Sequence, residues 1–276
     1  MGRITRSARV TRIVRDDGRL APDTRADALA VEEPLEIRVD GQSLTTTMRT
    51  PGHDFELVTG LLHAEGLIAE ASDILTMRYC AGSVGPYGEN TYNVIDVTTR
   101  AGHMPIEFIR NVTTTSACGI CGTASIEQLM KRQRYEISPV RPSASLLMSL
   151  PAVLQQDQHA FRRTGGIHAA GAFTLTGEPL VVREDVGRHN AADKVIGALL
   201  QEDKLPAREL LLVMSSRASF ELVQKAILAG FSGLVAVSAA TSLAVDLAKE
   251  SGLLLTGFTR ENRMNVYSGE VETDEA

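Results

Sequence analysis

Residues 209–258 decide the fold, and they read ELLLVMSSRASFELVQKAILAGFSGLVAVSAATSLAVDLAKESGLLLTGF. Short apolar runs of this kind predict buried strands, and there are three: ELLLVM (209–214), LVAVS (234–238) and LLLTGF (253–258). Helix patterns fill the two gaps, one from Ser219 to Gly230 and one from Leu243 to Lys249, with Gly252 just past its end. Strands that alternate with helices predict an α/β fold with a largely parallel sheet covered on both faces.

The residues before this stretch extend the pattern. GAFTLTGEPLVVRED (171–185) has the alternation of a hairpin that turns at Thr176-Gly177. Asp185 precedes a predicted helix with an apolar face formed by Val195, Ile196, Leu199 and Leu200. Another helix is predicted between Ser143 and Arg163, and Pro151 is expected to break or restart it.

The N-terminal half predicts a smaller, mixed α+β unit. Asp40-Gly41 lies between two strand-like runs in EIRVDGQSLTTTMRT (36–50), which indicates a hairpin. Asp54 is expected to cap a helix that ends before Gly66, and Thr91 to Thr99 alternate like a strand. A Gly/Thr/Ser-rich loop is predicted over 111–122, followed by a helix around 126–132.

Composition excludes several classes of protein. The chain has 276 residues, 28 Lys+Arg and 34 Asp+Glu, and its net charge of −6 argues against a general nucleic-acid coat. Hydrophobic residues make up 43% and charged residues 22%, as in a globular protein. Three cysteines predict a reduced, cytoplasmic protein, and we find no secretory signal. The charge-free run 226–245 contains six Gly, Ser and Thr residues and is interpreted as helix, strand and helix, not as a membrane span.

These patterns divide the chain into five predicted segments. They are a flexible basic N-terminal arm (1–30), an α+β subdomain (31–115), a mobile C-x-x-C loop with a connecting helix (116–140), an α/β domain (141–270) and an acidic tail (271–276). Five arginines, at positions 3, 6, 9, 12 and 15, precede the first acidic residue. The arm is interpreted either as a solvated tail or as a segment that meets an acidic partner or the other subunit.

Polar residues follow the predicted strands of the α/β domain, where open α/β sheets bind ligands. If the strands are parallel, four segments share one edge: 183–190, Ser215 to Arg217, Ser238 with Thr241, and 258–265. Arg217 stands beside a helix N-terminus, which favours an anion, and Arg260 and Arg263 can add bidentate phosphate contacts. His189 and Asp193 are four residues apart on one helix face. Together these loops predict a site for an anionic ligand.

The cysteines suggest thiol chemistry. Cys118 and Cys121 form a C-x-x-C flanked by glycines, a setting that often lowers the pKa of a thiol. Zinc is the alternative, because deaminases carry H-x-E before P-C-x-x-C, and this chain has His63-Ala64-Glu65. That proline is absent here, and His63 also suits the last turn of a helix as a cation. Cys80 is expected to be buried and inert, and His168, after two glycines, is either a turn residue or a ligand.

Five motifs resemble the FdhD family of formate dehydrogenase accessory sulfurtransferases. They are ACGICG, TGGIHAAG, REDVGRHNAADK, SSRASFELVQKA and GFTRENRMNVYSG, and the resemblance covers the chain from about residue 30. It implies a cytidine-deaminase-like three-layer C-terminal domain after a smaller α+β subdomain, and a cytoplasmic homodimer. The partners it implies are a cysteine desulfurase and the formate dehydrogenase apoenzyme, without nucleic acid or membrane.

The activity implied by this resemblance is sulfur transfer. A persulfide sulfur would pass from the desulfurase to the molybdenum or tungsten of the bis-molybdopterin guanine dinucleotide cofactor, a transient substrate and not a resident group. Cys118 would be the persulfide carrier and Cys121 an assisting cysteine. The segment Phe258-Thr259-Arg260-Glu261-Asn262-Arg263 would bind the guanine dinucleotide, and we add Arg217 and His189 to that site. The alternatives are a non-catalytic cofactor chaperone and a zinc-dependent deaminase.

Overall fold

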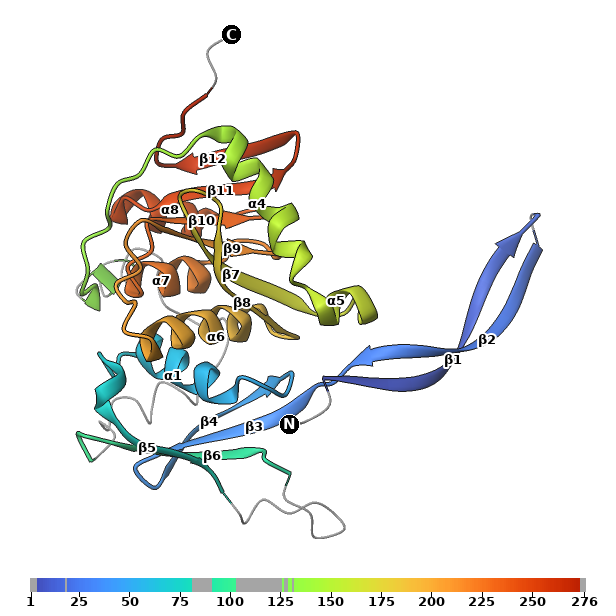
Figure 1. Ribbon diagram of the computed structural model, residues 1–276, viewed down its shortest axis with the longest axis horizontal. Coiled ribbons are helices and arrows are strands. Elements are labelled where there is room, and N and C mark those ends of the chain that lie inside the picture. The colour runs from blue at the N-terminus through green and yellow to red at the C-terminus, as the bar shows by residue number, and fades with distance from the viewer. Residues whose placement is uncertain are drawn as a thin grey trace.

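The chain is a mixed α/β protein. The computed structural model describes residues 4–17, 19–80, 91–102, 126, 129–130 and 132–273. Two sheets with their helices form the body, and a two-stranded arm projects from it (Figure 1). No helix among the described residues is long and apolar enough to cross a membrane.

The larger sheet has the order β12-β11-β10-β9-β7-β8. Its strands are β7 (His168–Thr174), β8 (Pro179–Asp185), β9 (Leu210–Met214), β10 (Gly233–Ala236), β11 (Leu254–Arg260) and β12 (Arg263–Ser268). The three predicted strands β9, β10 and β11 are parallel to one another, and the β7–β8 hairpin is confirmed. The sheet is nevertheless mixed, because β7 is antiparallel to both its neighbours and β12 is antiparallel to β11.

The strand β12 was not predicted, and it changes the interpretation of the segment 258–263. Glu261 and Asn262 form the turn of a hairpin in which Arg260 is paired with Arg263. A turn this short joins only antiparallel neighbours, so the chain cannot leave the sheet after β11. The predicted cofactor segment is therefore the tip of a hairpin and not a loop after the last strand.

Helices cover both faces of this sheet. Helix α4 (Ala144–Gln156) lies on one face, where Leu147, Leu150 and Leu154 are buried against the strands. The other face carries α6 (Arg188–Gln201), α7 (Phe220–Leu228) and α8 (Ser242–Ser251). The predicted apolar face of α6 is buried as expected. These elements form three layers, with α4 and the other helices on opposite sides of the sheet (Figure 1).

Pro151 does not break its helix, contrary to the sequence prediction. Helix α4 runs through it, and the chain turns only at Asp157, before the short helix α5 (His159–Thr164). A proline inside a helix removes one backbone hydrogen bond at a cost of about 3 kcal/mol. The leucine contacts with the sheet offset that cost.

The smaller sheet has the order β4-β3-β6-β5 and forms the N-terminal subdomain. Its elements are β3 (Glu33–Val39), β4 (Gln42–Arg49), α1 (Asp54–Glu65), η1 (Ala71–Asp73), β5 (Ile74–Tyr79) and β6 (Val94–Thr99). The predicted turn is confirmed, since Asp40 and Gly41 both have positive φ, 49° and 80°. The N-cap of α1 is His53 and not Asp54, whose carboxylate instead accepts hydrogen bonds from Gly52 N and Arg49.

Two glycines let the subdomains approach closely. Helix α1 crosses α6 where Gly60 faces Asp193 and Gly197 faces Glu56. A Cβ atom on Gly197 would lie 1.8 Å from the backbone oxygen of Glu56, and one on Gly60 would lie 1.9 Å from that of Asp193. Neither position can carry a side chain unless the two backbones separate.

The N-terminal residues form a regular hairpin, which the sequence patterns did not predict. Strand β1 (Thr5–Asp16) pairs with β2 (Arg19–Ala30) along its full length. The hairpin is named here the β1–β2 arm. The helix predicted over 126–132 is seen at Ile126, Leu129, Met130 and Arg132, whereas the predicted loop over 111–122 lies outside the described residues.

Replacing Gly197 with alanine tests the helix crossing. An alanine normally stabilises a helix interior by about 0.5–1 kcal/mol over glycine. Here overpacking reverses the sign, and we expect Gly197→Ala to lower the free energy of unfolding by roughly 1–3 kcal/mol in urea denaturation. Gly166→Ala, where the nearest atom lies 3.9 Å from a new Cβ, is the control and should change little. A stabilised Gly197→Ala variant would contradict the close crossing.

Candidate functional site at the carboxyl edge of the sheet

The carboxyl ends of four strands meet at one edge of the larger sheet. Strands β8, β9, β10 and β11 run in the same direction because β7 is antiparallel to both β8 and β9. The four polar segments therefore share an edge, as predicted, although the sheet is not fully parallel. The antiparallel β7 adds its own beginning, His168, to this edge.

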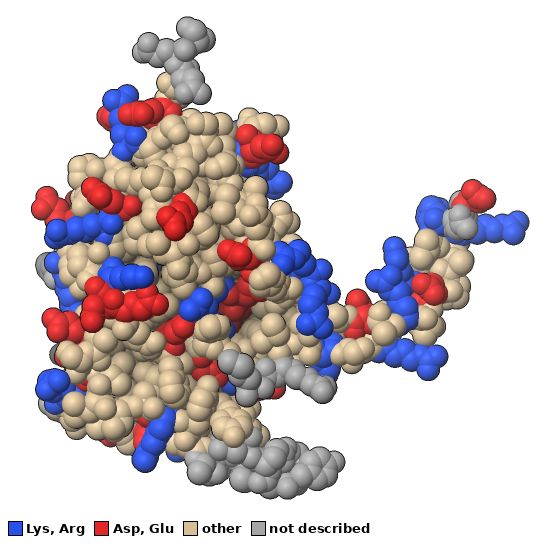
Figure 2. All heavy atoms as spheres, in the orientation of Figure 1, with Lys and Arg blue, Asp and Glu red and all other residues tan. Residues whose placement is uncertain are grey.

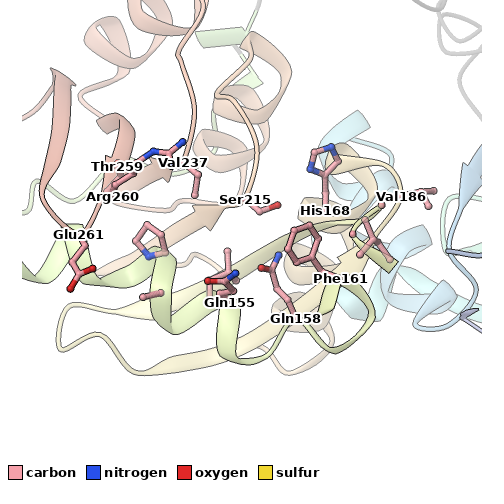
Figure 3. A pocket seen from close by; sticks show the side chains of 16 residues that line it. Gln155, Gln158, Phe161, His168, Val186, Ser215, Val237, Thr259, Arg260 and Glu261 are labelled. Atoms are coloured by element: carbon pink, nitrogen blue, oxygen red, sulfur yellow. The ribbon is translucent and has the colours of Figure 1, made fainter. Parts of the chain in front are cut away.

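A cavity of about 610 Å³ opens at this edge, between the sheet and the α4–α5 pair. Figure 3 shows Gln155, Gln158 and Phe161 on the side of α4 and α5, with Ser215 and His168 on the side of the sheet. Thr259, Arg260 and Glu261 reach it from the β11–β12 hairpin. The lining combines a guanidinium, a carboxylate, an imidazole and amides, which suits a polar ligand.

The walls of the cavity are held by hydrogen bonds to the sheet. The Glu184 carboxylate on β8 accepts hydrogen bonds from the backbone N–H groups of Ala160 and Phe161, both 2.8 Å long, and fixes the start of α5. Gly165 ends α5 in the left-handed region at φ 65°. Ser215 Oγ accepts a 2.9 Å hydrogen bond from Ala169 N, which joins the end of β9 to the start of β7.

The predicted cofactor segment contributes half of its residues to the cavity. Thr259, Arg260 and Glu261 line it, and the buried Thr259 is held by a 3.0 Å hydrogen bond with Thr256. Phe258 does not line it; its backbone has φ 51° and its ring is 38% exposed. Positive φ is costly for an aromatic residue, so this conformation depends on the bulge in β11 and on the hydrogen bond from Phe258 N to Ser238 O.

Asn262 and Arg263 are exposed and do not line the cavity. Arg217 and His189 do not line it either; they belong to a basic cluster at the same edge, defined by Arg188, His189 and Arg217. His189 lies 3.3 Å from Ser219 Oγ and 3.9 Å from a Glu221 oxygen. Burial, with the charges of Arg188 and Lys225, lowers the pKa of His189 to about 4.

His168 connects the cavity to the basic cluster. Burial lowers the pKa of His168, and the positive charge of Arg188 lowers it further. The charge of Arg188 therefore lowers the pKa of both histidines. Both imidazoles are thus kept neutral at neutral pH.

Three helices begin at this edge without side-chain caps. Helices α6, α7 and α8 start after Gly187, Ser219 and Thr241, and within the described chain none of these residues makes a side-chain cap hydrogen bond. Ser219 occupies the predicted N-cap position, but its backbone oxygen, not its side chain, accepts hydrogen bonds from Leu222 N and Val223 N. Free N–H groups at a helix start favour an anion. The edge is thus suited to phosphate at several neighbouring positions.

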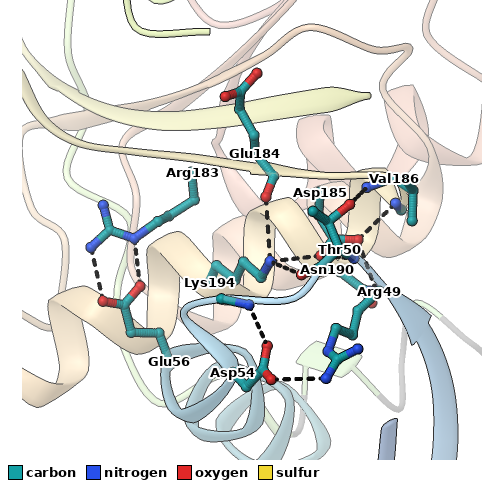
Figure 4. A network of polar contacts seen from close by, with 12 residues as sticks. Arg49, Thr50, Asp54, Glu56, Arg183, Glu184, Asp185, Val186, Asn190 and Lys194 are labelled. Carbon is teal, nitrogen blue, oxygen red and sulfur yellow. Dashed lines mark hydrogen bonds and ion pairs between the residues drawn. The ribbon is translucent and has the colours of Figure 1, made fainter. Parts of the chain in front are cut away.

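A buried polar network fixes this edge to the N-terminal subdomain (Figure 4). Lys194 Nζ lies 2.7 Å from an Asp185 oxygen, and both side chains are almost fully buried. Thr50 joins the pair with all three of its polar atoms: its N–H donates to Asp185, its C=O accepts from Lys194, and its Oγ1 accepts from Val186 N. We call Thr50, Asp185 and Lys194 the Thr50 network.

Neighbouring residues extend the network across the two subdomains. Asn190 donates to Asp185 and to Met48 O, at 3.1 and 2.7 Å. Arg183 on β8 forms a bidentate ion pair with Glu56 on α1, at 2.5 and 2.8 Å. Asp193 pairs with Lys225 at 2.6 Å and not with His189, the residue predicted to share its helix face. Burial raises the pKa of Asp193 to about 6 despite this pair.

Most polar residues of REDVGRHNAADK therefore hold the fold together, although they were predicted as part of a ligand site. The residues that sequence reasoning missed are those that α4 and α5 bring to the cavity, Gln155, Gln158 and Phe161. The sequence did carry a signal for these residues. The predicted hairpin makes β7 antiparallel to β8, which places TGGIH (164–168) and the helix before it at the carboxyl edge.

His63 and Cys80 differ from their predictions. His63 is buried at 3% exposure on α1, and within the described chain neither ring nitrogen has a hydrogen-bond partner. Burial, with repulsion by Arg134 and Lys225, lowers its pKa to about 4, so it is a neutral residue and not a cation at the helix end. Cys80 is half-buried, not buried, and follows β5. Cys118 and Cys121 lie outside the described residues.

Comparison with known proteins identifies the family. A model of the FdhD/NarQ family matches residues 30–273. The chain belongs to the FdhD/NarQ family. Among its relatives, the sulfur carrier protein FdhD of Corynebacterium efficiens is 57% identical over 276 residues, covering 98% of this chain and all of the relative. The sulfur carrier protein FdhD of Mycobacterium tuberculosis is 49% identical over 251 residues, 89% of this chain and 91% of the relative.

A solved structure has the same fold as this FdhD/NarQ chain. It is the crystal structure of a putative formate dehydrogenase accessory protein from Desulfotalea psychrophila. The TM-score is 0.69 at 22% sequence identity, covering 95% of this chain and 97% of the other. Within the described residues of the FdhD/NarQ chain, no group of three or more His, Cys, Asp or Glu side chains is placed to hold a metal ion.

Replacing Lys194 tests the Thr50 network of this FdhD/NarQ protein. Lys194→Met leaves the Asp185 carboxylate buried without its counter-charge, and removing one partner of a buried ion pair typically costs 3–5 kcal/mol. We expect a loss of about that size in the free energy of unfolding, measured in urea. Lys204→Met, at a side chain that is 49% exposed, is the control. A loss below about 1 kcal/mol for Lys194→Met would mean that Asp185 does not need the ammonium group.

The neutral His63 predicts a pH dependence of stability. Its pKa is about 4 in the folded protein against 6.5 as the reference value, so the unfolded chain binds the proton more tightly. The stabilisation is complete above pH 6.5 and is lost as the pH falls towards 4. At pH 5 the loss is about 2 kcal/mol relative to pH 7.5. His63→Leu should remove that part of the pH dependence in urea denaturation, whereas the exposed His159→Leu should retain it.

Proposed function

We propose that this FdhD/NarQ protein is a sulfurtransferase that carries a persulfide sulfur from a cysteine desulfurase to the bis-molybdopterin guanine dinucleotide cofactor of formate dehydrogenase. Two kinds of similarity support the proposal. Relatives at 57% and 49% identity are named sulfur carrier proteins, and the protein with the same fold is titled a formate dehydrogenase accessory protein. The motif CGICG supplies a thiol pair for such a step.

The carboxyl-edge cavity is the observation that carries the cofactor half of the proposal. A guanine dinucleotide brings two phosphates and a flat base. Arg260 suits a phosphate in the cavity, while Gln155, Gln158 and Phe161 offer amides and a ring to the base. The starts of α6 and α8, which lie at the same edge outside the cavity lining, offer further positions for an anion. Arg217 and His189 extend the site along the same edge. Phe258, Asn262 and Arg263 are assigned to its outer rim.

The sulfur step balances with the two cysteines of this chain. The Cys118 thiolate attacks the terminal sulfur of the desulfurase persulfide, the donor's S–S bond breaks, and the donor cysteine leaves as a thiolate. In the second step the Cys121 thiolate attacks the inner sulfur of the Cys118 persulfide. A Cys118–Cys121 disulfide forms and the outer sulfur leaves as sulfide, the form in which a metal ion binds it. A cellular thiol reductant then restores both thiols.

The remaining parts of the proposal concern assembly, compartment and fold. We assign the chain to the cytoplasm, where thiols stay reduced, and to a homodimer that meets the desulfurase and the formate dehydrogenase apoenzyme. The strand order β8-β7-β9-β10-β11, with only β7 reversed, supports a cytidine-deaminase-like C-terminal domain. Such a fold does not by itself imply deamination.

Mass spectrometry after desulfurase treatment tests the sulfur step. The purified protein is incubated with a cysteine desulfurase and cysteine, and its peptides are measured with and without a reductant. We expect one added sulfur, about 32 Da, on the Cys118 peptide, removed by reductant and absent from Cys118→Ala. Cys121→Ala should accumulate the persulfide, because the release step is blocked. An unmodified Cys118 beside an active desulfurase would favour a non-catalytic cofactor chaperone.

Nucleotide binding tests the cavity separately. GDP serves as the probe for the guanine dinucleotide end, titrated against the protein by calorimetry. Arg260→Ala removes a charge-assisted contact worth about 1.5–3 kcal/mol, so we expect GDP to bind roughly 10- to 100-fold more weakly. Arg208→Ala, at an exposed residue away from the cavity, should leave the affinity unchanged. Equal GDP affinities in the two variants would show that the cavity does not bind the guanine dinucleotide, and would leave the proposed persulfide chemistry of Cys118 unaffected.

A further inference from the structure

The β1–β2 arm lies outside everything the proposed site uses. It consists of two strands of twelve residues, paired from Thr5↔Ala30 to Asp16↔Arg19, and a strand of that length spans roughly 40 Å. Its base contacts α5, and the rest projects away from the body (Figure 1). The family match begins only at residue 30, so the family's shared sequence does not account for the arm.

An arm of this kind is not stable through its own contacts. Among its described side chains none is buried, and the apolar ones near its tip, Ile13 and Leu20, are 60% and 64% exposed. Ordering each residue costs roughly 1–2 kcal/mol, while a backbone hydrogen bond returns only about 1 kcal/mol, so an isolated two-stranded hairpin is marginal in water. A regular hairpin of twelve pairs therefore requires another surface to pack on.

The charge of the arm indicates what that surface is. Residues 1–30 contain seven arginines and four aspartates, whereas the other 246 residues contain 21 basic and 30 acidic ones. The arm is thus basic and the rest of the chain strongly acidic. Figure 2 shows basic side chains spread along the whole arm, with acidic ones between them. The partner that this arm fits is a protein of net negative charge, and the body of the same chain, with 30 acidic against 21 basic residues, has such a charge.

The spacing of the arginines favours a partner that surrounds the arm. Arginines three residues apart on a strand point to alternate faces, so Arg6 and Arg12 share one face and Arg9 and Arg15 the other. Each face also carries aliphatic side chains, Val10 and Val14 on the first and Ile13 on the second. Aspartates interrupt the positive charge, as at the pair Arg12↔Asp23, which disfavours a nucleic-acid backbone.

We propose that the β1–β2 arm docks on the body of a second copy of this chain, and that each copy of a two-fold dimer clasps the other with its arm. In such a dimer the arm of each copy contacts the same surface on the body of the other copy, as an isologous interface requires. The inference rests on the homodimer part of the proposed function and adds the element that holds the dimer together. The persulfide chemistry does not depend on it.

The association constant of charge-reversed variants tests this assignment. Sedimentation equilibrium is measured on the full-length chain, on Arg9→Glu/Arg12→Glu/Arg15→Glu, and on a control with the same charge change on exposed residues of the body, Lys204→Glu/Arg208→Glu/Lys249→Glu. We expect a dimer that the arm variant weakens at least tenfold and the control less than twofold. Raising NaCl from 0.05 to 0.5 M should weaken the unmodified dimer as well.

A crosslink identifies the partner surface independently of affinity. A photoreactive benzoylphenylalanine replaces Ile13, and crosslinked peptides are identified after mixing ¹⁵N-labelled with unlabelled protein. Mixed-isotope peptides that join residue 13 to the body confirm the second copy. Crosslinks within one copy only, or a monomer at all concentrations, would overturn the proposal. An equally tight dimer in the arm variant would leave the homodimer standing and remove the arm from it.

Discussion

The Lys194–Asp185 ion pair is the interaction on which the rest of the molecule depends. Both groups are almost fully buried, and Thr50 from the N-terminal subdomain contacts Asp185, Lys194 and Val186 at once. Burying an ammonium and a carboxylate costs several kcal/mol each, and only a complete set of partners offsets that cost. The cost also gives specificity, because a shifted docking of the two subdomains would leave both charges unpaired.

The same network sets the geometry of the candidate site. Asp185 ends β8 and receives the N–H of Gly187, so it fixes the turn into α6. Glu184, its neighbour, holds the start of α5 and with it one wall of the cavity. The close crossing of α1 and α6 at Gly60 and Gly197 adds a second constraint on the same helix. The start of α6 and one wall of the cavity are thus held in place by contacts within the protein.

The sequence predicted the elements better than their connections. Three parallel strands, two hairpins and most helices follow from period and turn residues such as Asp40-Gly41 and Thr176-Gly177. The hairpin at Thr176-Gly177 implies that β7 is antiparallel to β8, but neither the place of β7 between β8 and β9 nor the added β12 could be predicted, because apolar runs do not encode which strands are neighbours. The predicted helix break at Pro151 was wrong for another reason. The tendency of proline to end a helix is outweighed by the contacts of the α4 leucines with the sheet, which exist only in the folded protein. The β1–β2 arm lacks the alternation of a half-buried strand, so its two strands were not predicted.

The sequence predicted where the candidate site lies but only some of the residues that form it. The rule that ligands bind beyond the carboxyl ends of strands placed Thr259, Arg260 and Glu261 correctly. It failed for Asn190 and Asp193, since polar residues at a helix start serve a buried interface as readily as a ligand. Gln158 and Phe161 were missed because they precede β7, whose start was not recognised as part of the carboxyl edge.

Transfer of labelled sulfur tests most directly whether the Cys118 thiol delivers sulfur to a cofactor bound at the carboxyl edge. The protein is loaded with ³⁵S from cysteine by a desulfurase, separated from free cysteine, and mixed with formate dehydrogenase that lacks its sulfido ligand. The account predicts label on the isolated cofactor with the unmodified protein, none with Cys118→Ala, and a strongly reduced amount with Arg260→Ala, which still carries the persulfide. Equal labelling by Arg260→Ala, or any labelling through Cys118→Ala, would contradict it.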